Sequence, residues 1–395
     1  MVMKKLMFFM FMFLVLVASC TKNGDKAAVK MAQEYSTIKE KLRNQRDLVD
    51  SESAYLKWKE EAKNLRVGLL EKYKNAESTP ALELCRSRLL IDLGETEQAL
   101  AKLDEIISRN GKEALEAKFE KVRVLQEQQK LNESLMLFRQ VEDRIKKTPD
   151  YFDVLLNFAW GLEDAGSRSR YSKKFINTPG IPREMERYLP YMYENIAAIA
   201  RHRGDLPESK KILKDAIRKL NEEGKGIGSL EYTLRKTEMI GKPAPEILAK
   251  TWVNSKPLKL SRLKGKVVVI DFWATWCAPC RVVIPTLVKE YNALKNKGVM
   301  VIGYTRLYGN YRDDIQRKGK VEPEEEIRLT KDFLKRFGIN YPVAIAEDTG
   351  VFDNFQIRGI PTMFFIDKDG RVADFKVGSG NEKFISDKIQ YLLGS

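Results

Sequence analysis

The sequence of 395 residues contains only one histidine, His202, and only four cysteines. Protein metal centres are built from several histidine, cysteine or acidic ligands, and hydroxyl or thiol nucleophiles are commonly activated by a histidine base. Clustered metal sites and histidine-activated nucleophiles are therefore excluded, and we predict neither a metal nor a cofactor. We expect His202 to lie at the end of a helix and to have no catalytic role. A framework of structural disulfides is excluded as well.

Apolar runs long enough to cross a membrane are also missing. The run at residues 6–17 is too short, because a spanning helix needs about 20 residues. It follows two lysines and precedes small residues, which is the layout of an export signal. Residues 17–20, Val-Ala-Ser-Cys, resemble a bacterial lipobox, which implies cleavage before Cys20 and attachment of lipid to its thiol. We predict a signal peptide at 1–19, a lipidated tether at 20–49 and a cell-envelope location, on a membrane facing the periplasm. An ordinary secretory signal and an uncleaved anchor remain alternatives.

Basic residues outnumber acidic residues, 70 to 55, which gives a formal net charge of +15. This excess is spread over both halves of the chain, without a basic tail and without a nucleic-acid-binding motif. The simplest interpretation of this excess of positive charge is a solvated, lysine-rich surface. The charge also permits attraction to an anionic membrane or to acidic partners. We predict no nucleic-acid partner.

Residues 50–238 show a helical pattern with a weak internal repeat. Residues 93–100, 129–135 and 203–209 have similar turn sequences, and their spacing is close to the roughly 34-residue period of tetratricopeptide helix pairs. We predict an all-α, tetratricopeptide-like (TPR-like) domain, which is either a docking surface for a protein partner or a helical spacer. Cys85 is predicted to be a small buried residue of one helix. A disulfide to another chain is the alternative.

The motif Cys277-Ala278-Pro279-Cys280 carries the chemistry of the chain. It follows the apolar run 267–273, which predicts a buried strand, and it precedes a predicted helix. A thiol at a helix N-terminus has its pKa lowered from about 8.5 to roughly 3.5–7.5, so Cys277 is predicted to be the nucleophile and Cys280 the resolving thiol of a redox pair. A metal site lacks further ligands, and haem attachment requires a histidine where Arg281 stands.

Two motifs resemble thioredoxin: residues 271–280, Asp-Phe-Trp-Ala-Thr-Trp-Cys-Ala-Pro-Cys, and residues 358–362, Arg-Gly-Ile-Pro-Thr. The lead-in at 241–245 and an insertion after Tyr304 are more similar to the membrane-anchored TlpA/ResA group of disulfide reductases. The resemblance covers about residues 239–395 and does not extend to the first 238. We therefore predict a thioredoxin-like domain after the helical one. Its expected strands are 267–272, 299–304, 341–346, 362–366 and 371–377, with helices at 278–297 and 381–393.

The resemblance also implies roles for residues around the cysteines. Asp271 corresponds to a buried aspartate that accepts or relays the proton of the second cysteine, and Ile360-Pro361 corresponds to a cis-proline loop that contacts the substrate peptide. Trp276 is expected to be an exposed substrate contact. The glutamate that ResA-type reductases carry after the second cysteine is absent, so Asp271 is expected to act alone. The insertion at 306–337 either forms a wall of the substrate groove or has no role in it.

These observations predict a membrane-anchored thiol-disulfide oxidoreductase whose partners are protein dithiols or disulfides and an upstream thiol donor. Ala-Pro between the cysteines resembles reducing members of the family, so we expect a protein disulfide reductase. A thiol peroxidase is one alternative, although Val269 and Ala274 occupy the proline and threonine positions of the peroxiredoxin signature. A docking lipoprotein whose TPR-like repeats recruit a partner is the other.

Overall fold

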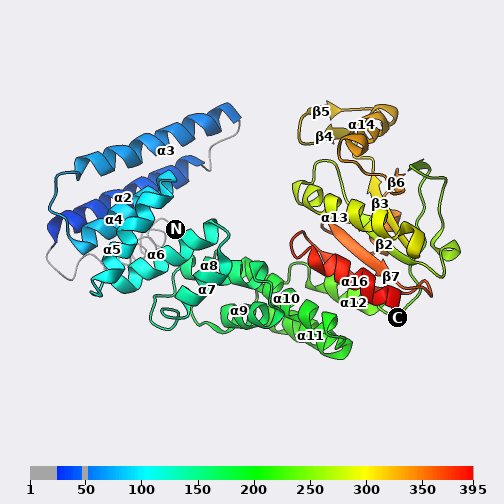
Figure 1. Cartoon of the computed structure of the whole chain (residues 1–395), viewed down its shortest axis with the longest axis horizontal. Coiled ribbons are helices and arrows are strands. Elements are labelled where there is room, and N and C mark those ends of the chain that lie inside the picture. The colour runs from blue at the N-terminus through cyan, green and yellow to red at the C-terminus, as the bar shows by residue number, and fades with distance from the viewer. Residues whose placement is uncertain (1–24, 47–51, 395) are drawn as a thin grey trace. The chain divides into compact units, whose positions relative to one another are not determined.

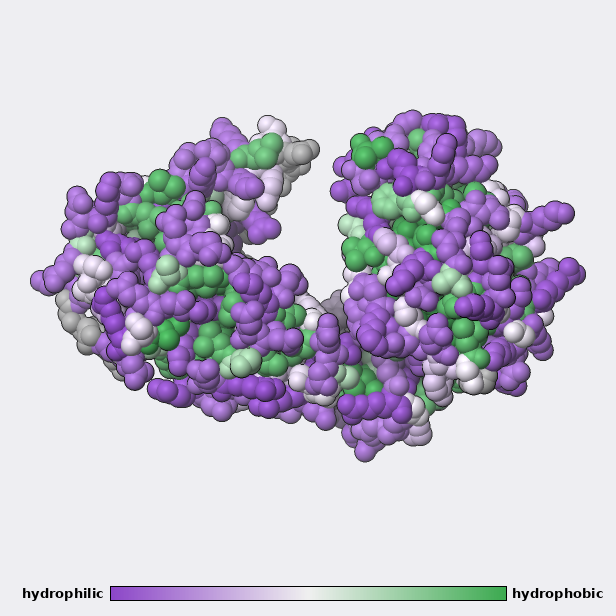
Figure 2. Space-filling model, viewed as in Figure 1, coloured by the Kyte–Doolittle hydropathy of each residue, from purple (hydrophilic) through white to green (hydrophobic). Residues whose placement is uncertain are grey.

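The computed structural model describes residues 25–46 and 52–394 of the chain (Figure 1). The predicted signal peptide and Cys20 lie outside these residues. Contacts divide the chain into two compact units, one ending at Phe158 and one beginning at Ala159. Within the described residues no helix is both long enough and apolar enough to cross a membrane. Charged and polar side chains cover most of the visible surface of each unit, as the composition predicts (Figure 2).

The first unit is entirely helical in its described residues. The sequence sets the helix ends locally: Thr79 caps one helix by accepting the Leu82 N–H, Pro80 occupies its first turn, and Gly94 ends it in the left-handed conformation. Consecutive helices from α4 to α7 pack against each other in pairs. The helices are α2 (Lys26–Arg46), α3 (Glu52–Lys72), α4 (Pro80–Leu93), α5 (Thr96–Ser108), α6 (Ala114–Glu127), α7 (Leu131–Phe138) and α8 (Pro149–Gly161), the last of which extends past Phe158 into the second unit.

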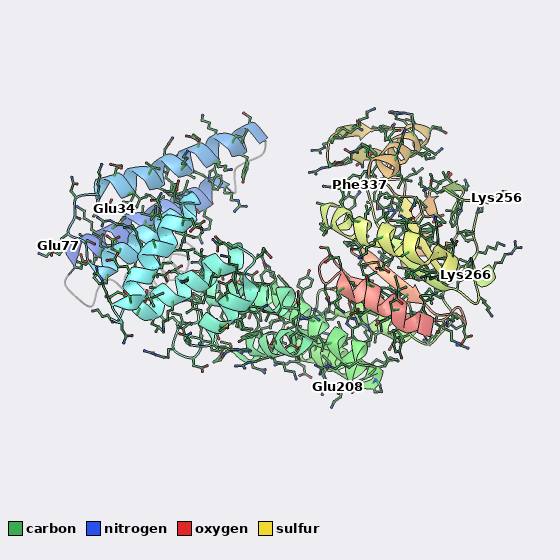
Figure 3. All side chains as sticks on the ribbon, in the orientation of Figure 1. Glu34, Glu77, Glu208, Lys256, Lys266 and Phe337 are labelled. Carbon is green, nitrogen blue, oxygen red and sulfur yellow. A yellow bond between two sulfur atoms is a disulfide. The ribbon has the colours of Figure 1, made fainter. Side chains whose placement is uncertain are left out.

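Helix α2 occupies most of the segment that the sequence predicts to be a tether. Ala28, Met31, Ala32 and Tyr35 follow helical spacing and are buried in a cluster that also contains Leu82 of α4. On the outer surface, Lys72 of α3 forms an ion pair of 2.7 Å with Glu34 of α2, which Figure 3 labels. The helical unit therefore includes residues 26–46.

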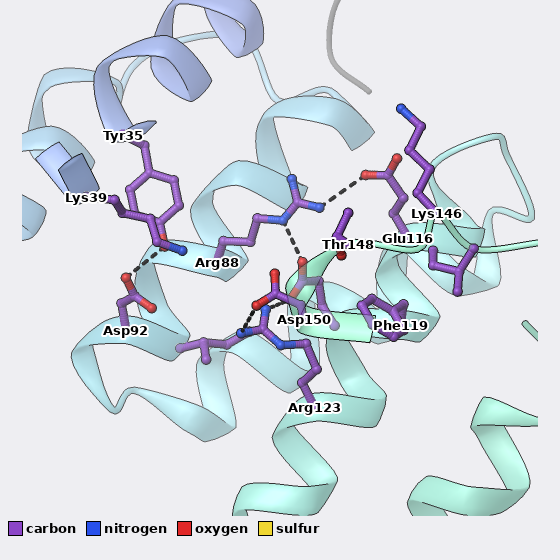
Figure 4. Close-up of a pocket in the computed structure, with 13 residues that line it drawn as sticks. Tyr35, Lys39, Arg88, Asp92, Glu116, Phe119, Arg123, Lys146, Thr148 and Asp150 are labelled. Atoms are coloured by element: carbon purple, nitrogen blue, oxygen red, sulfur yellow. Dashed lines mark hydrogen bonds and ion pairs between the residues drawn. The ribbon is translucent and has the colours of Figure 1, made fainter. Parts of the chain in front are cut away.

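A network of charged side chains, with Glu120 buried and the others partly exposed, joins α4 to α6 (Figure 4). The Arg88 guanidinium contacts Glu120 at 2.7 Å and Glu116 at 3.1 Å, and Arg123 contacts Glu120 at 2.8 Å. Burial by itself raises the pKa of Glu120, but the two arginines outweigh burial and hold it at about 2. These pairs line a cavity of about 110 Å³. The positive and negative side chains of this network neutralise each other, and the contacts of Arg88 with Glu116 and Glu120 link α4 to α6.

The second unit begins with helices and continues into a sheet. Asp164 and Asp205 cap two of its helices by accepting backbone N–H groups three residues ahead. The predicted domain boundary at residue 239 falls inside this unit, where α12 contacts strand β8. The helices are α9 (Ala165–Asn177), the 3₁₀ turn η2 (Glu186–Tyr188), α10 (Leu189–His202), α11 (Leu206–Glu222) and α12 (Leu230–Met239).

The sheet has six strands in the order β1-β6-β3-β2-β7-β8. The central strand β2 pairs in parallel with β3 and antiparallel with β7, and all six of its residues are buried. A βαβ unit followed by a ββα unit is therefore present, as the sequence predicts. The strands are β1 (Thr251–Val253), β2 (Val267–Phe272), β3 (Val299–Arg306), β6 (Val343–Ala346), β7 (Thr362–Ile366) and β8 (Val372–Val377).

Each face of the sheet is covered by its own hydrophobic cluster. Residues of β2 alternate between the two clusters, as the two-residue period of a strand requires. The cluster that contains the cysteines packs under α13 (Ala278–Leu294) and α16 (Lys383–Gly394), whereas the opposite cluster includes residues of α15 (Gly350–Asn354). Short 3₁₀ turns lie at η3 (Leu260–Arg262) and η4 (Lys295–Lys297).

The insertion after β3 packs against the core through Phe333 and Leu334, which belong to the cluster that contains the cysteines. It consists of a two-stranded hairpin, β4 (Asn310–Arg312) and β5 (Arg317–Lys320), followed by α14 (Pro323–Arg336). Glu326 of α14 accepts the backbone N–H groups of Tyr308 and Gly309 at 2.8 and 2.9 Å. At the other end of α14, Phe337, which Figure 3 labels, stacks on Phe333, with ring centroids 4.3 Å apart.

Candidate active site

Cys277 and Cys280 are joined by a disulfide, with their Cα atoms 5.2 Å apart. Cys277 is the N-cap of α13, and its Sγ accepts the backbone N–H of Cys280 at 3.2 Å. Only 3% of Cys277 and none of Cys280 is exposed. In the reduced protein, the helix dipole and this N–H group favour a thiolate at Cys277 over one at Cys280. The two sulfurs therefore differ, because Cys277 lies at the N-terminus of α13 and is slightly exposed, whereas Cys280 is fully buried.

Asp271 lies on the central strand, on the face of the sheet that carries the cysteines. Asp271 lies on the same face of β2 as Val267 and Val269, which belong to the cluster containing Cys277 and Cys280, and it is fully buried. Neither carboxylate oxygen has a hydrogen-bond partner among the described residues. Burial raises the pKa of Asp271 to about 7, and Lys376 lowers it in part. Such a carboxyl group can exchange a proton near neutral pH.

The Ile360-Pro361 peptide bond is cis. Ile360 is half-buried against the cluster that contains both cysteines, so the loop borders the disulfide region. Thr362 donates its hydroxyl to the Gly359 carbonyl at 2.7 Å, and the Gly378 N–H donates to the Pro361 carbonyl at 2.8 Å. These two bonds fix the loop between β7 and the end of β8.

Trp276 lies just before Cys277 and is 41% exposed. Its ring meets the ring of Tyr308 edge-on, with centroids 5.6 Å apart. Beside it, the Thr275 hydroxyl donates to the Arg312 carbonyl at 2.7 Å, and Arg281 donates to the Thr275 carbonyl at 3.0 Å. The loop that carries Cys277 is therefore bonded to the insertion.

Sequence reasoning did not single out Tyr308, Arg312 or Lys376 as neighbours of the site. A usable signal existed for the first two, because β2 and β3 pair in parallel and their carboxyl ends lie at the same edge of the sheet. No local pattern pointed to Lys376, whose place depends on the pairing of β7 with β8.

The carboxyl-terminal part of the chain is similar to known proteins. The AhpC/TSA family matches residues 240–375. A thiol-disulfide oxidoreductase ResA of Bacillus cereus is 31% identical over 151 residues, covering 38% of this chain and 77% of the relative. ResA of Bacillus subtilis (strain 168) is 30% identical over 173 residues, covering 42% and 87%.

Among solved structures, a thiol:disulfide interchange protein of the thioredoxin family from Chlorobium tepidum TLS is 30% identical, with a TM-score of 0.31. It covers 38% of this chain and 96% of its own. Both relatives are named thiol-disulfide oxidoreductases. The chain thus contains a thioredoxin-fold domain in its carboxyl-terminal part and belongs to the thioredoxin-like thiol-disulfide oxidoreductases of the ResA group.

Proposed function

We propose that this oxidoreductase is a membrane-anchored protein disulfide reductase that works through Cys277, Cys280 and Asp271. The observation that carries the proposal is a disulfide at the N-terminus of α13, on the same face of the sheet as a fully buried carboxyl group without a hydrogen-bond partner among the described residues. Burial that raises the pKa of Asp271 to about 7 suits a group that takes up and releases one proton per cycle.

The reaction begins with the reduced protein. The Cys277 thiolate attacks one sulfur of a substrate disulfide, and the other substrate sulfur leaves as a thiolate. Asp271 then accepts the Cys280 proton, and the Cys280 thiolate attacks the Cys277 sulfur of the mixed disulfide. The second substrate sulfur leaves as a thiolate, so the substrate gains two electrons and the Cys277–Cys280 bond is formed. An upstream thiol donor returns the pair to its reduced state.

Trapping tests the assigned order of attack. The Cys280→Ser variant should accumulate mixed disulfides through Cys277, whereas Cys277→Ser should accumulate none. Asp271→Asn should fold and should slow the reaction most near neutral pH, where the carboxylate is the base. Identical rates and pH profiles for Asp271→Asn and the wild type would argue against the proton-transfer role.

The direction of electron flow has its own measurement. The protein is expected to have a low reduction potential, close to that of thioredoxin at about −270 mV. A potential near about −120 mV, at the oxidising end of the scale, would exclude a reductase.

Substrate contact is proposed for Trp276, Ile360 and Pro361, which border the disulfide region. Support comes from the exposure of Trp276 and from the cis peptide bond between the other two residues. Trp276→Ala should raise KM for a protein disulfide more than for a small disulfide such as oxidised glutathione. Equal effects on the two substrates would assign Trp276 to packing.

The membrane anchor is proposed from the sequence at Cys20. Lipid on this thiol and on the new amino group would hold the chain to a membrane, because two or more acyl chains are needed for stable anchoring. Cys20→Ala should move the protein from the membrane fraction to the soluble fraction.

We propose TPR-like repeats for the helices that precede the sheet, on the basis of the consecutive pairwise packing of α4 to α7 in the first unit and of α9 to α12 in the second. If the repeats dock substrates, Tyr191→Lys at their exposed surface should change which proteins Cys280→Ser traps. If the repeats are a spacer, the trapped set should stay the same.

A thiol peroxidase is the second candidate, because the matching family is described as AhpC/TSA. Peroxide consumption that persists in Cys280→Ser would favour it over the reductase.

A further inference from the structure

An arginine lies close to the disulfide, at the edge of the sheet where the insertion begins. Arg306 is the last residue of β3, which pairs in parallel with β2, the strand that leads to the cysteines. Its guanidinium lies 4.5 Å from the centre of the Tyr308 ring. The Tyr308 ring in turn meets the ring of Trp276, with centroids 5.6 Å apart. Two ring contacts therefore connect Arg306 to the residue that precedes Cys277.

The charge of Arg306 is not neutralised within the part of the chain that the structure describes. No carboxylate among these residues forms an ion pair with it. Two acids of this region are engaged elsewhere. Asp353 accepts the Thr349 hydroxyl at 2.9 Å and pairs with Arg358 at 2.8 Å, and Glu326 accepts two backbone N–H groups at the start of the insertion. Arg306 is therefore available to a carboxylate from outside the chain.

Stacking makes Arg306 a suitable group for recognising a carboxylate. The contact with Tyr308 restricts the plane of the guanidinium, so less conformational freedom is lost when a ligand binds. A guanidinium has five N–H donors, more than one tyrosine contact uses. Its remaining donors can bind the two oxygens of a carboxylate together, which a lysine ammonium does less well.

The insertion adds further positive charge beside the same edge. Residues 306–321 include five arginines or lysines and only two aspartates, and Arg336 of α14 holds both aspartates at 2.6 and 3.0 Å. The Thr275 hydroxyl donates to a carbonyl of β4 at 2.7 Å, which fixes the hairpin against the loop before the cysteines. Three basic residues of the hairpin are exposed and form no ion pair with a described residue: Arg312, Arg317 and Lys320.

We propose that the preferred substrates are proteins whose disulfide is flanked by aspartate or glutamate side chains, and that Arg306 is the specificity-determining residue that binds one of these carboxylates. The exposed cations of the hairpin attract the same acidic segment at longer range. This inference rests on the proposed function and names the substrate class of the same site. The carboxylate takes no part in the exchange of electrons, so the reaction at the sulfurs is the one already described.

The test uses the reduced full-length protein and three synthetic peptides. The peptides share one intramolecular disulfide and differ only in the residues beside it, which are glutamate, glutamine or lysine. Mixing each peptide with the reduced protein gives a second-order rate constant for oxidation of the cysteines. Tryptophan fluorescence is a suitable signal, because Trp273 lies in the same cluster as the cysteines.

Salt dependence in the wild type is the first measurement. At about 0.01 M salt, the glutamate peptide should react about fivefold faster than the glutamine peptide, the size that one or two partly exposed ion pairs provide. The lysine peptide should be the slowest of the three. At about 1 M salt the three rates should converge, because charges are then screened beyond about 3 Å. This measurement requires no variant to fold.

Charge variants then test the assignment to Arg306. Arg306→Gln should bring the rates of the glutamate and glutamine peptides close together at low salt, and Arg306→Glu should make the lysine peptide the fastest. Arg371→Gln and Arg371→Glu are the matched controls and should keep the wild-type preference. Arg371 is exposed and follows β7, at the edge of the sheet opposite the cysteines. If Arg306 only packed the insertion through Tyr308, its variants would slow all three peptides alike and would not reverse the preference.

The outcomes separate this inference from the proposed function. If the reduced wild type reacts with none of the peptides, the proposed function fails. If it reacts with all three at equal rates in low salt, the proposed function stands and the preference for acidic substrates is refuted. A preference that survives in both Arg306 variants refutes the role of Arg306. An equal loss of preference in the Arg371 variants would also refute it, because the effect would then belong to the total charge of the protein.

Discussion

Arg201 should be the most costly side chain to remove from the helices of the second unit. It lies at the end of α10, and its Nε contacts the Asp374 carboxylate of β8 at 2.7 Å. Its Nη2 donates to the Phe375 carbonyl at 2.9 Å, and its guanidinium lies 3.8 Å from the centre of the Phe375 ring. The Arg201 and Asp374 side chains are 5% and 2% exposed. This is a buried, desolvated ion pair with an added cation–π contact.

The expected loss of stability in Arg201→Met depends on the Asp374 charge that stays buried after the substitution. Removing one partner of a buried ion pair costs about 3–5 kcal/mol, because the remaining charge stays buried. Here Asp374 keeps a second cation, Lys388, at 2.9 Å, so the lower end of the range applies, about 3 kcal/mol. For a unit of this size, 1 kcal/mol shifts Tm by about 2–4 °C, so a loss of roughly 6–12 °C is expected.

Thermal unfolding of the full-length protein checks this value. Arg203→Met is the matched control, since Arg203 lies two residues further along and is exposed. A double-mutant cycle with Asp374→Asn should show that the two substitutions together cost less than their sum. If Arg201→Met melts within about 1 °C of the control, the contact between helix and sheet contributes nothing and the reasoning is wrong.

Three further outcomes are expected. Burial lowers the pKa of His202, the only histidine, from 6.5 to about 3, so the wild type should lose stability as the pH falls below 6.5. In urea unfolding at several pH values, the free energy of unfolding of His202→Gln should depend less on pH than that of the wild type. Gly303→Ala places a Cβ 2.9 Å from the Trp273 ring nitrogen and should cost about 1–3 kcal/mol, whereas Gly319→Ala meets open space and should cost far less in the same denaturation assay. Cys85→Ala should leave the two-electron redox titration unchanged, because Cys85 is buried in the first unit; a dimer on non-reducing gels that disappears in this variant would instead reveal an interchain disulfide.

The sequence predicts the sheet of the carboxyl-terminal domain well because its strands are long apolar runs. The strand at 267–272 has the predicted bounds, and β7 at Thr362–Ile366 does too. The short strand β1 and the hairpin strand β5 were missed for a physical reason. A three-residue edge strand has too few positions to show alternation, and all four residues of β5 are exposed, so they carry no hydrophobic pattern.

The candidate site could be predicted only where it is local in sequence. The cysteines and the residues just before them form one strand-to-helix junction, so their proximity follows from the motif. Nothing in the sequence around Lys376 distinguishes it from an exposed lysine, and only two strand pairings, through Met363, place it in one row with Asp271. Arg201 and Asp374 are separated by 173 positions, and no pattern within either segment predicts their contact. The helical part was likewise predicted, whereas its repeat character stays a prediction.

The contact between α10 and β8 has a practical consequence for the design of shorter expression fragments. A fragment that begins at residue 239, just before the family match, would expose the Phe375 side of β8 to solvent. It would also lack Arg201, the arginine that pairs with Asp374. The smallest autonomous piece should instead start before the cap residue Asp164, so that α9–α12 remain attached. Crystallisation trials and inhibitor screens should therefore use this longer piece.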